Sequence, residues 1–439
     1  MKPKAIIAVG LLFSSAIAPS VPAQSTSTAK RHTDPQAEAL NRLLNDAQAA
    51  IDKKDYDTAA RDYSDYLAKK PDDASIHFNL GFVFTAEGKA DAARPEYERA
   101  IALDPKMAAA YLNLGLTILP SDPAAAVAPL RQTTQLQPDN SRAKFFLGLA
   151  LERSGKPVDA IEQYKASEQL DAKSIDIRLA LGHAAAAAHQ PDDAVKAYRD
   201  ALALQPSEND AAQAHLGLAR ALDEAKQPEA AAAEFRAYLQ QRPNDASVRT
   251  QYAQILAGEG KSDDALAALS AVPATGSDQL AALRVSAQLQ IQANRTDDAI
   301  ATLLKAEALA PNDASLPAQA AELYMKKKDY ENAGHQLTTA FNLNPSDSDV
   351  LKALIGAEYQ AKNYPTALEA IDVLAKRAPL PPDALFVRAA CYDKLNQLAP
   401  ALEAYKQFLQ ANKDENSDMY FESTVRVRVL TRELREKKK

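Results

Sequence analysis

The stretch Ala74–Pro105 reads ASIHFNLGFVFTAEGKADAARPEYERAIALDP and holds two helical patterns separated by a turn. Four residues of the first pattern share one helix face by their i, i+3, i+4, i+7 spacing: His77, Leu80, Gly81 and Phe84. Gly88 then interrupts the pattern, and glycine readily adopts the positive φ that often follows a helix end. The stretch therefore predicts a helix, a tight turn and a second helix.

The second helix is predicted to carry Ala93, Tyr97 and Ala100 on its inner face. It should end before Pro105, because proline lacks the N–H and clashes with the preceding helical turn. Gly81 and Ala93 are small, so the two helices can approach closely where these residues meet. Tyr97 is predicted to fill the space beside that contact.

The same signals recur along the chain at intervals of about 34 residues. The second-helix pair recurs as Ala59/Tyr63, Ala93/Tyr97, Ala126/Leu130, Ala160/Tyr164, Ala194/Tyr198, Ala231/Phe235, Ala265/Leu269, Ala299/Leu303, Ala333/Leu337, Ala367/Ile371 and Ala401/Tyr405. Closing prolines and Leu-Gly pairs keep the same phase in many of these copies. The chain is therefore predicted to contain about 11 copies of one helix–turn–helix unit.

These residues resemble the tetratricopeptide repeat (TPR) family, whose pattern is an aromatic, L-G, an aromatic, A-x3-F and a closing P. Here the pattern is His77-x2-Leu80-Gly81-x2-Phe84, Ala93-x3-Tyr97 and Pro105, with His77 in place of the usual large aromatic. The resemblance implies an all-α fold, an α-solenoid in which the helix pairs form a right-handed superhelix. It also implies that the first helices line a concave groove that binds proteins or peptides.

Composition agrees with an alanine-rich helical protein. Hydrophobic residues make up 46% of the 439 residues, aromatic residues 6%, and tryptophan is absent. The net charge of −7 is spread along the chain, and it favours neither an acidic tail nor a nucleic-acid-binding surface. The single cysteine, Cys391, is predicted to be a small buried residue of a first helix.

The two ends of the chain differ from the repeats. Residues 1–23 resemble a bacterial-type signal peptide, with Lys2 and Lys4 before an apolar run and a small-residue cleavage pattern ending at Ala23. This pattern predicts export to the periplasm or the exterior, with no transmembrane span once the peptide is removed; an uncleaved membrane anchor is the alternative. The predicted segments that follow are a flexible leader and helix start (24–39), the solenoid (40–413, with a soft joint near 272–279) and a C-terminal capping helix (414–439).

The capping helix, expected over about 418–437, is predicted to cover the end of the last repeat. The residues expected to provide that cover are Tyr420, Phe421, Val425, Val427, Val429, Leu430 and Leu434. Basic residues follow its polar side: Arg426, Arg428, Arg432, Arg435 and Lys437–Lys439. They fit either a solvated C-terminus favoured by the helix dipole or a site for anionic lipid or nucleic acid.

Residue patterns typical of catalysis are missing from the sequence, which has no G-x-S-x-G, H-E-x-x-H, Walker or complete G-x-G-x-x-G motif. No two of the six histidines lie three or four residues apart. His77 and His215 are predicted to be satisfied packing residues, and the pairs Asp192-Asp193, Asp263-Asp264 and Asp297-Asp298 to complement helix N-termini. The sequence therefore predicts a protein that is not an enzyme and holds no cofactor or metal.

The candidate binding site is the groove face of the first helices in the second, third and fourth repeats. Its predicted residues are Phe78, Asn79, Phe82, Leu112, Asn113, Leu116, Phe145, Phe146 and Leu149. They could hold an apolar peptide or helix, or several could instead pack against the neighbouring repeat. Farther along, equivalent positions become polar: Arg220, Thr250, Gln254, Arg284, Gln288, Glu322 and Lys352. Phe78 and Phe82 stand where the family's carboxylate clamp has polar residues, so binding of chaperone tails is not expected.

The predicted function is a non-catalytic scaffold or adaptor of the cell envelope or exterior that binds a protein or peptide partner, with a monomer favoured. The alternative is a structural component of an envelope assembly that self-associates through its C-terminal helix.

Overall fold

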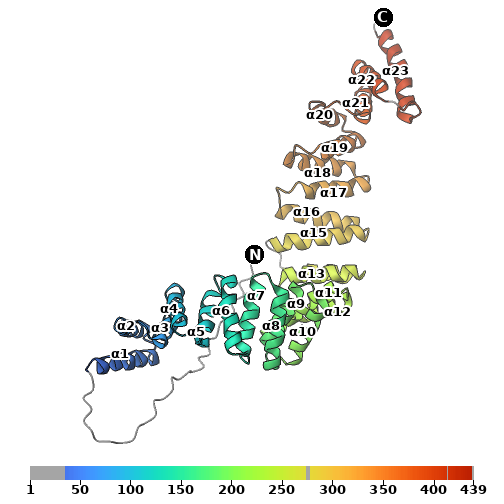
Figure 1. The fold of residues 1–439 in the computed structure, drawn as a ribbon. Coiled ribbons are helices and arrows are strands. Elements are labelled where there is room, and N and C mark those ends of the chain that lie inside the picture. The colour runs from blue at the N-terminus through green and yellow to red at the C-terminus, as the bar shows by residue number, and fades with distance from the viewer. Residues whose placement is uncertain (1–34, 273–276, 413, 438–439) are drawn as a thin grey trace, which may run out of the picture. The chain divides into compact units, whose positions relative to one another are not determined.

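The computed structural model describes residues 35–272, 277–412 and 414–437, and every regular element in these ranges is an α-helix. The all-α prediction is therefore confirmed (Figure 1). The predicted signal peptide, residues 1–23, lies outside the described residues, as do residues 24–34 of the leader. Pro35 is the first helical residue described, and proline is favoured in the first turn of a helix.

The described helices pack as eleven successive pairs and one final helix (Figure 1). The first helices of the pairs are α1 (Pro35–Asp52), α3 (Ala74–Ala86), α5 (Ala108–Ile118), α7 (Ser141–Arg153), α9 (Ile175–Ala187), α11 (Glu208–Glu224), α13 (Ala246–Gly258), α15 (Ser277–Gln292), α17 (Ser315–Lys326), α19 (Ser348–Gln360) and α21 (Pro382–Lys394). The second helices are α2 (Tyr56–Leu67), α4 (Ala90–Leu103), α6 (Pro123–Leu136), α8 (Pro157–Leu170), α10 (Pro191–Ala203), α12 (Pro228–Gln241), α14 (Ser262–Ser270), α16 (Thr296–Leu309), α18 (Tyr330–Leu343), α20 (Tyr364–Ala375) and α22 (Leu398–Ala411). The final helix is α23 (Asp418–Glu436).

The helices belong to two compact units. The first unit ends at Leu136 and contains α1–α6, and the second begins at Gln137 and contains α7–α23. The soft joint predicted near 272–279 falls within the second unit, between α14 and α15, and residues 273–276 lie outside the described ranges.

The turn inside each pair places one residue in the left-handed backbone region in every pair except α5–α6. These residues are Lys54, Gly88, Gly155, His189, Lys226, Gly260, Asn294, Lys328, Lys362 and Asn396. The residue after the left-handed one donates its N–H to a carbonyl of the last helical turn, as from Lys89 to Phe84 at 2.8 Å. The prediction for Gly88, whose φ is 74°, is confirmed.

The two helices of a pair meet at a small residue covered by a large one. A Cβ atom added to Gly81 would lie 2.9 Å from the Tyr97 ring, and one added to Gly148 would lie 2.6 Å from the Tyr164 ring. This confirms the predicted close approach at Gly81. In the seventh to tenth pairs the covering residue is aliphatic, and all four such residues are buried: Leu269, Leu303, Leu337 and Ile371.

Neighbouring pairs are linked by ion pairs at the start of their second helices. Lys89 lies 3.3 Å from Asp57 of the preceding pair, and Arg295 lies 2.5 Å from Asp263 of its preceding pair. Lys327 pairs with Asp297 in the same way. The doubled aspartates lie in the first turns of α10, α14 and α16, as predicted from their sequence position. These contacts are exposed, so we assign them to register between repeats more than to stability.

The final helix covers the last pair, but only some of the apolar residues predicted to provide that cover do so. Leu430 is fully buried against α21 and α22, and Val427 and Leu434 pack beside it. Phe421 and Val425, however, are 72% and 39% exposed, so the prediction that they cover the last repeat is wrong. Both lie on the outer face of α23, because a helix that buries Leu430 turns these positions away from the body of the protein.

A buried carboxyl group lies between the ninth and tenth pairs. Glu358 of α19 is 7% exposed and packs against Gly334 of α18, at the position that Phe84 occupies in the second pair. Burial raises the pKa of Glu358 above its ordinary value, and a hydrogen bond with Asn363 offsets part of that effect. Ionised Glu358 is therefore a source of instability in an otherwise apolar interface.

We expect Glu358→Gln to raise the free energy of unfolding at neutral pH and to flatten its dependence on pH. Because folding raises the pKa of Glu358, the protonated carboxyl contributes stability that is complete below its ordinary pKa of 4.5 and is lost as pH rises through the folded-state value. Thermal midpoints of both proteins between about pH 4 and pH 8 test this. Glu322→Gln, at an exposed position on α17, should follow the wild type. A difference between wild type and Glu358→Gln that stays constant with pH would contradict the argument.

Candidate binding surface on the first helices

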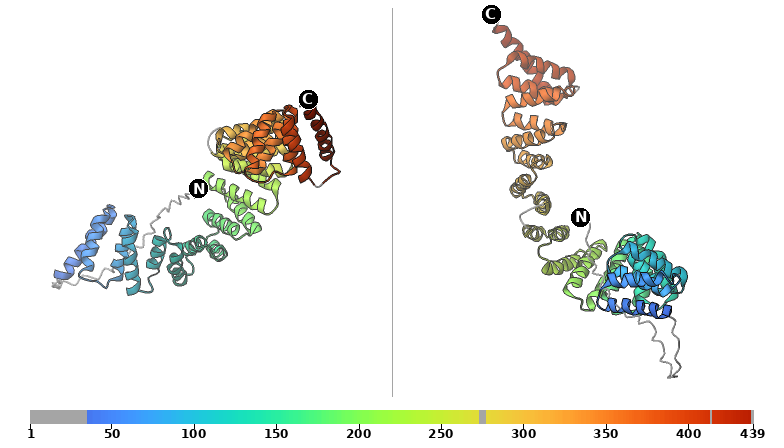
Figure 2. Two further views of the ribbon diagram at one scale, coloured as in Figure 1. Left: turned by 90° about the horizontal axis from the view of Figure 1, so that it is seen from above. Right: turned by 90° about the vertical axis from the view of Figure 1, so that its left-hand side faces the viewer.

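Some first helices of neighbouring pairs contact one another, as α3 does α5 in the first unit and α9 does α11 in the second. Figure 2 shows the successive helix pairs of each unit from two further directions. In each unit we call the face of the first helices that carries the predicted binding residues the first-helix surface. Three positions of each helix contribute to it, and in the second pair these are Phe78, Asn79 and Phe82. They lie three and two residues before Gly81 and one residue after it.

In the first unit the structure brings six predicted residues together on α3 and α5, and all six are half-buried: Phe78, Asn79, Phe82, Leu112, Asn113 and Leu116. Several have partners within the protein. The Phe78 ring lies 5.9 Å from the Tyr97 ring, and Phe82 packs against the core formed by α1, α2 and α3. Burial raises the pKa of Tyr97 to about 12, and hydrogen bonds with Thr85 and Asn113 oppose that rise. Asn113 thus contacts the tyrosine of the preceding pair.

In the second unit the remaining three predicted residues, Phe145, Phe146 and Leu149, lie half-buried on α7. Phe145 contacts the rings of Phe146 and Tyr164, with centroids 5.4 and 5.7 Å away. The guanidinium group of Arg142 lies over the Phe146 ring at 5.5 Å.

One of the three surface positions has a packing role that recurs. Phe386 of α21 is equivalent to Phe78 and Phe145, and its ring lies 6.3 Å from that of Tyr405, the covering residue of its own pair. The same ring contact therefore occurs in the second, fourth and eleventh pairs. Phe78 and Phe145 consequently serve packing within their pairs. At the position after the glycine, the His183 ring makes a similar contact, 5.6 Å from the Tyr198 ring, whereas Leu116 and Leu149 lie half-buried there.

The position after the glycine changes character along the chain. It is apolar and half-buried in the second to fourth pairs and polar and exposed in the fifth to ninth pairs: Phe82, Leu116 and Leu149, then His183, Arg220, Gln254, Gln288 and Glu322. Three other predicted polar residues have partners on their own or a neighbouring element. The Thr250 hydroxyl donates to the Ala246 carbonyl, Lys352 lies 2.9 Å from Asp349, and Arg284 pairs with Asp313.

A polar cluster in the second unit was not foreseen from the sequence. The Tyr164 hydroxyl donates to Glu152 at 2.7 Å, the Tyr198 hydroxyl lies 3.2 Å from Nδ1 of His183, and Arg220 donates to Gln251 at 3.1 Å. Burial raises the pKa of Glu152.

The groups of this cluster act on one another electrostatically. Burial raises the pKa of Tyr198, and the nearby Glu152 raises it further. Desolvation by the surrounding helices lowers the pKa of His183, and the positive charge of Arg220 lowers it further. His183 and Arg220 nevertheless remain accessible, so they are available to a ligand. The repeat register could have revealed Glu152. It lies four residues after Gly148, and Thr85, four residues after Gly81, contacts Tyr97 of the second pair in the same way.

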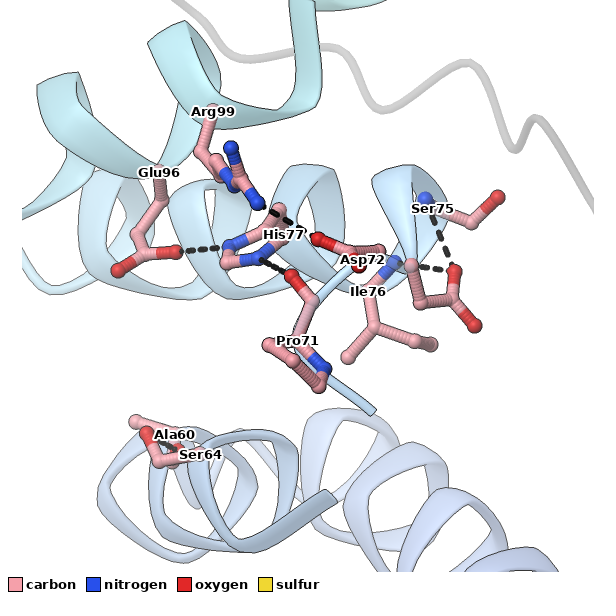
Figure 3. Close-up of polar contacts among 10 residues, drawn as sticks. Ala60, Ser64, Pro71, Asp72, Ser75, Ile76, His77, Glu96 and Arg99 are labelled. Carbon is pink, nitrogen blue, oxygen red and sulfur yellow. Dashed lines mark hydrogen bonds and ion pairs between the residues drawn. The ribbon is translucent and has the colours of Figure 1, made fainter. Parts of the chain in front are cut away.

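Two other histidines on first helices are engaged inside the protein. The Nδ1 atom of His77 lies 2.6 Å from Glu96, and its Nε2 donates to the Pro71 carbonyl at 2.9 Å (Figure 3). His215 makes the equivalent 2.6 Å contact with Glu234. The interpretation of both as satisfied packing residues is confirmed. In Figure 3, Arg99 and Asp72 form a further link between the first and second pairs at 2.6 Å.

The described part of the chain offers little reactive chemistry. Within it, no group of three His, Cys, Asp or Glu side chains is placed to hold a metal ion. Cys391 is fully buried, as predicted, and burial raises the pKa of its thiol to about 12. None of the helices in the described ranges has the length and apolar character needed to cross a bilayer.

Comparison with solved structures finds proteins built from similar helix pairs. A MamA crystal structure is 25% identical and aligns over 38% of this chain and 93% of its own, with a TM-score of 0.38. MamA from Desulfovibrio magneticus RS-1 is 18% identical over 38% of this chain and 96% of its own, with a TM-score of 0.37. YrrB, described as a TPR protein with an unusual peptide-binding site, is 17% identical over 43% of this chain and 97% of its own, with a TM-score of 0.40. No curated protein matches the chain significantly.

Sequence profiles of one family match most of the chain. A tetratricopeptide repeat profile matches residues 44–108, 83–119, 121–175, 179–246, 319–379 and 363–416, and a second profile of that name matches residues 222–289. These spans cover more than half of the 439 residues and follow the helix pairs of the structure. The chain therefore belongs to the tetratricopeptide repeat family.

Proposed function

We propose that this protein is a non-catalytic scaffold that binds a segment of a partner protein on its first-helix surface. The observation that carries the proposal is the change along one repeated position, from Leu149 to the accessible His183 and Arg220. A ligand suited to this series has apolar side chains followed by an acidic or hydrogen-bonding group. Membership of the tetratricopeptide repeat family supports binding of a protein over chemistry on a small molecule.

Each part of the surface contributes a different interaction. Leu149 of α7 is half-buried, so a ligand on the second unit can cover apolar area that remains exposed to water. Leu116 of α5, also half-buried, offers such area on the first unit by itself. Arg220 is accessible, and its side chain donates a hydrogen bond to the neutral amide of Gln251. Its positive charge is therefore available to a carboxylate of the ligand. Glu152 accepts a hydrogen bond from Tyr164 on the neighbouring α8, which fixes the position of its carboxyl group.

Affinity capture from cell extract, followed by titration of the captured partner, tests this proposal. We expect Arg220→Glu to weaken binding by about tenfold or more, because it reverses the charge that faces the ligand. Leu116→Ala tests the first unit separately. Arg199→Glu is the matched control, since Arg199 is an exposed arginine on the second helix α10. If Arg199→Glu weakens binding as much as Arg220→Glu, the effect is one of net charge and the proposed surface is wrong.

We also propose that the scaffold acts outside the cytoplasm, in the envelope or the exterior. Support comes from the signal-peptide pattern of residues 1–23. Cell fractionation combined with the intact mass of the purified protein tests this. A mature protein that begins at Gln24 in the periplasm or medium is expected, and a cytoplasmic protein that retains residues 1–23 would refute it.

A further inference from the structure

The outer face of α23 carries a stripe of exposed residues with a coiled-coil spacing. Its members are separated by alternating steps of three and four residues, and all are exposed: Asp418, Phe421, Val425, Arg428, Arg432 and Arg435. This is the spacing of positions that face a partner helix in a coiled coil. Ser423 and Leu430, on the opposite side of α23, are fully buried against the protein. The stripe therefore lies on the side of α23 that is turned away from the buried contact with the last pair.

The chemistry of this stripe is unusual for the outside of a terminal helix, which is normally polar throughout. Phe421 is 72% exposed, and Val425, one helical turn later, is also exposed. Arg428, Arg432 and Arg435 follow at spacings where like charges repel each other along a helix. The stripe thus runs from acidic through apolar to basic.

We propose that the outer face of α23 binds the same face of a second copy of this chain, with the two helices antiparallel. A two-fold axis near the middle of the stripe would place Val425 opposite Arg428 of the second copy and Phe421 opposite its Arg432. It would also place Asp418 opposite Arg435 of the second copy. Each pairing occurs twice because the contact is two-fold symmetric.

These pairings would cover the exposed apolar residues of α23 and offset the repulsion among its arginines. The exposed Phe421 ring gains an arginine over its face, as the Phe146 ring already has from Arg142 at 5.5 Å. The acidic end neutralises part of the basic cluster, and the exposed ion pair of Arg432 with Glu436, at 3.6 Å, leaves the arginine side chain free to turn. Asp418 and Glu422 at the other end of the helix repel an anionic membrane, which favours the second copy over a lipid surface.

The contact should be weak and dependent on concentration and salt, because a single pair of helices buries little area. It is independent of the proposed binding of partners on the first-helix surface. A dimer would hold two such surfaces together and increase the avidity for a partner that offers two copies of its segment.

Sedimentation velocity of the purified protein over a range of concentrations tests the proposal by charge exchange. Asp418→Arg and Arg435→Asp should each weaken self-association by about tenfold or more, because each places like charges opposite one another. The double variant should restore it, since the pairing is then re-formed with the charges exchanged. Phe421→Lys should abolish it, because it places a positive charge opposite Arg432 and removes the apolar ring. Arg94→Glu, at an exposed position on α4, should leave self-association unchanged.

Circular dichroism on each variant separates loss of the contact from loss of the fold. The proposal is overturned if the wild type remains monomeric at all concentrations or if the double variant associates no better than the single ones. It is also overturned if vesicles containing anionic lipid bind the wild-type protein while that protein shows no self-association.

Discussion

Gly182→Ala is expected to destabilise the protein by about 2 kcal/mol, although alanine is normally the better helix former. A Cβ atom at position 182 would lie 2.6 Å from Cε1 of Tyr198. The tyrosine cannot move aside, because it is only 1% exposed and Gly217 of the next pair closes over its far end. Overpacking of such a site costs up to about 3 kcal/mol, of which alanine's helix preference recovers about 1.

Gly356→Ala provides the matched control for this prediction. Gly356 also lies within a first helix, α19, but nothing lies within 4 Å of the Cβ that would be added. The same substitution should therefore stabilise the protein there by up to about 1 kcal/mol. Guanidinium unfolding followed by circular dichroism measures both changes. Shifts of the same sign in the two variants would show that Tyr198 does not limit the space at Gly182.

Asp393→Ala is expected to loosen α23 and to cost about 2–3 kcal/mol in the last pair. Both oxygens of Asp393 accept bonds from Arg426 at 2.6 Å, and Tyr405 donates to one of them at 3.4 Å. Side chains of the pair are 14% and 32% exposed, so water only partly replaces the lost bonds. The substitution leaves the guanidinium group and a buried phenol without their common acceptor.

Hydrogen exchange is the suitable measurement for Asp393→Ala, because each pair in a repeat array contacts only its neighbours. Faster exchange in α21–α23 with unchanged exchange in α9–α11 is expected. Arg94→Ala serves as the control, since the Arg94–Glu98 pair is also a close arginine–carboxylate contact, at 2.8 Å, but both side chains are at least half exposed. Uniform acceleration along the chain would argue against a local role for Asp393.

The sequence predicts the helix pairs well because the deciding contacts repeat. Gly81, Ala93 and Tyr97 meet within one pair, and their spacing alone indicates the contact. The turn residues are harder to predict. Glycine at position 88 indicates a left-handed conformation, but Lys328 and Lys362 adopt the same conformation and their residue type does not indicate it. Here the helix ends impose the backbone geometry on residues with no preference for it.

The sequence predicts on which helix each candidate site residue lies, but not which side chains it contacts. Phe78 and Phe82 were placed correctly on a first helix, yet the contact of Phe78 with Tyr97 depends on how the second helix crosses it. In α23, helical spacing grouped Phe421 with Leu430 as covering residues. Spacing specifies which residues share a face, whereas the crossing angle on α22 decides which face is buried.

The pairing of tyrosine with glycine also gives this protein an optical property. The chain has no tryptophan, so its near-ultraviolet absorbance and fluorescence come mainly from tyrosine. Fully buried phenols occur in the second, fourth, fifth and eleventh pairs, at Tyr97, Tyr164, Tyr198 and Tyr405, whereas the seventh to tenth pairs have leucine or isoleucine there. Burial raises the pKa of each of these phenols. An alkaline titration followed by absorbance therefore reports on the packing of these pairs without any added label.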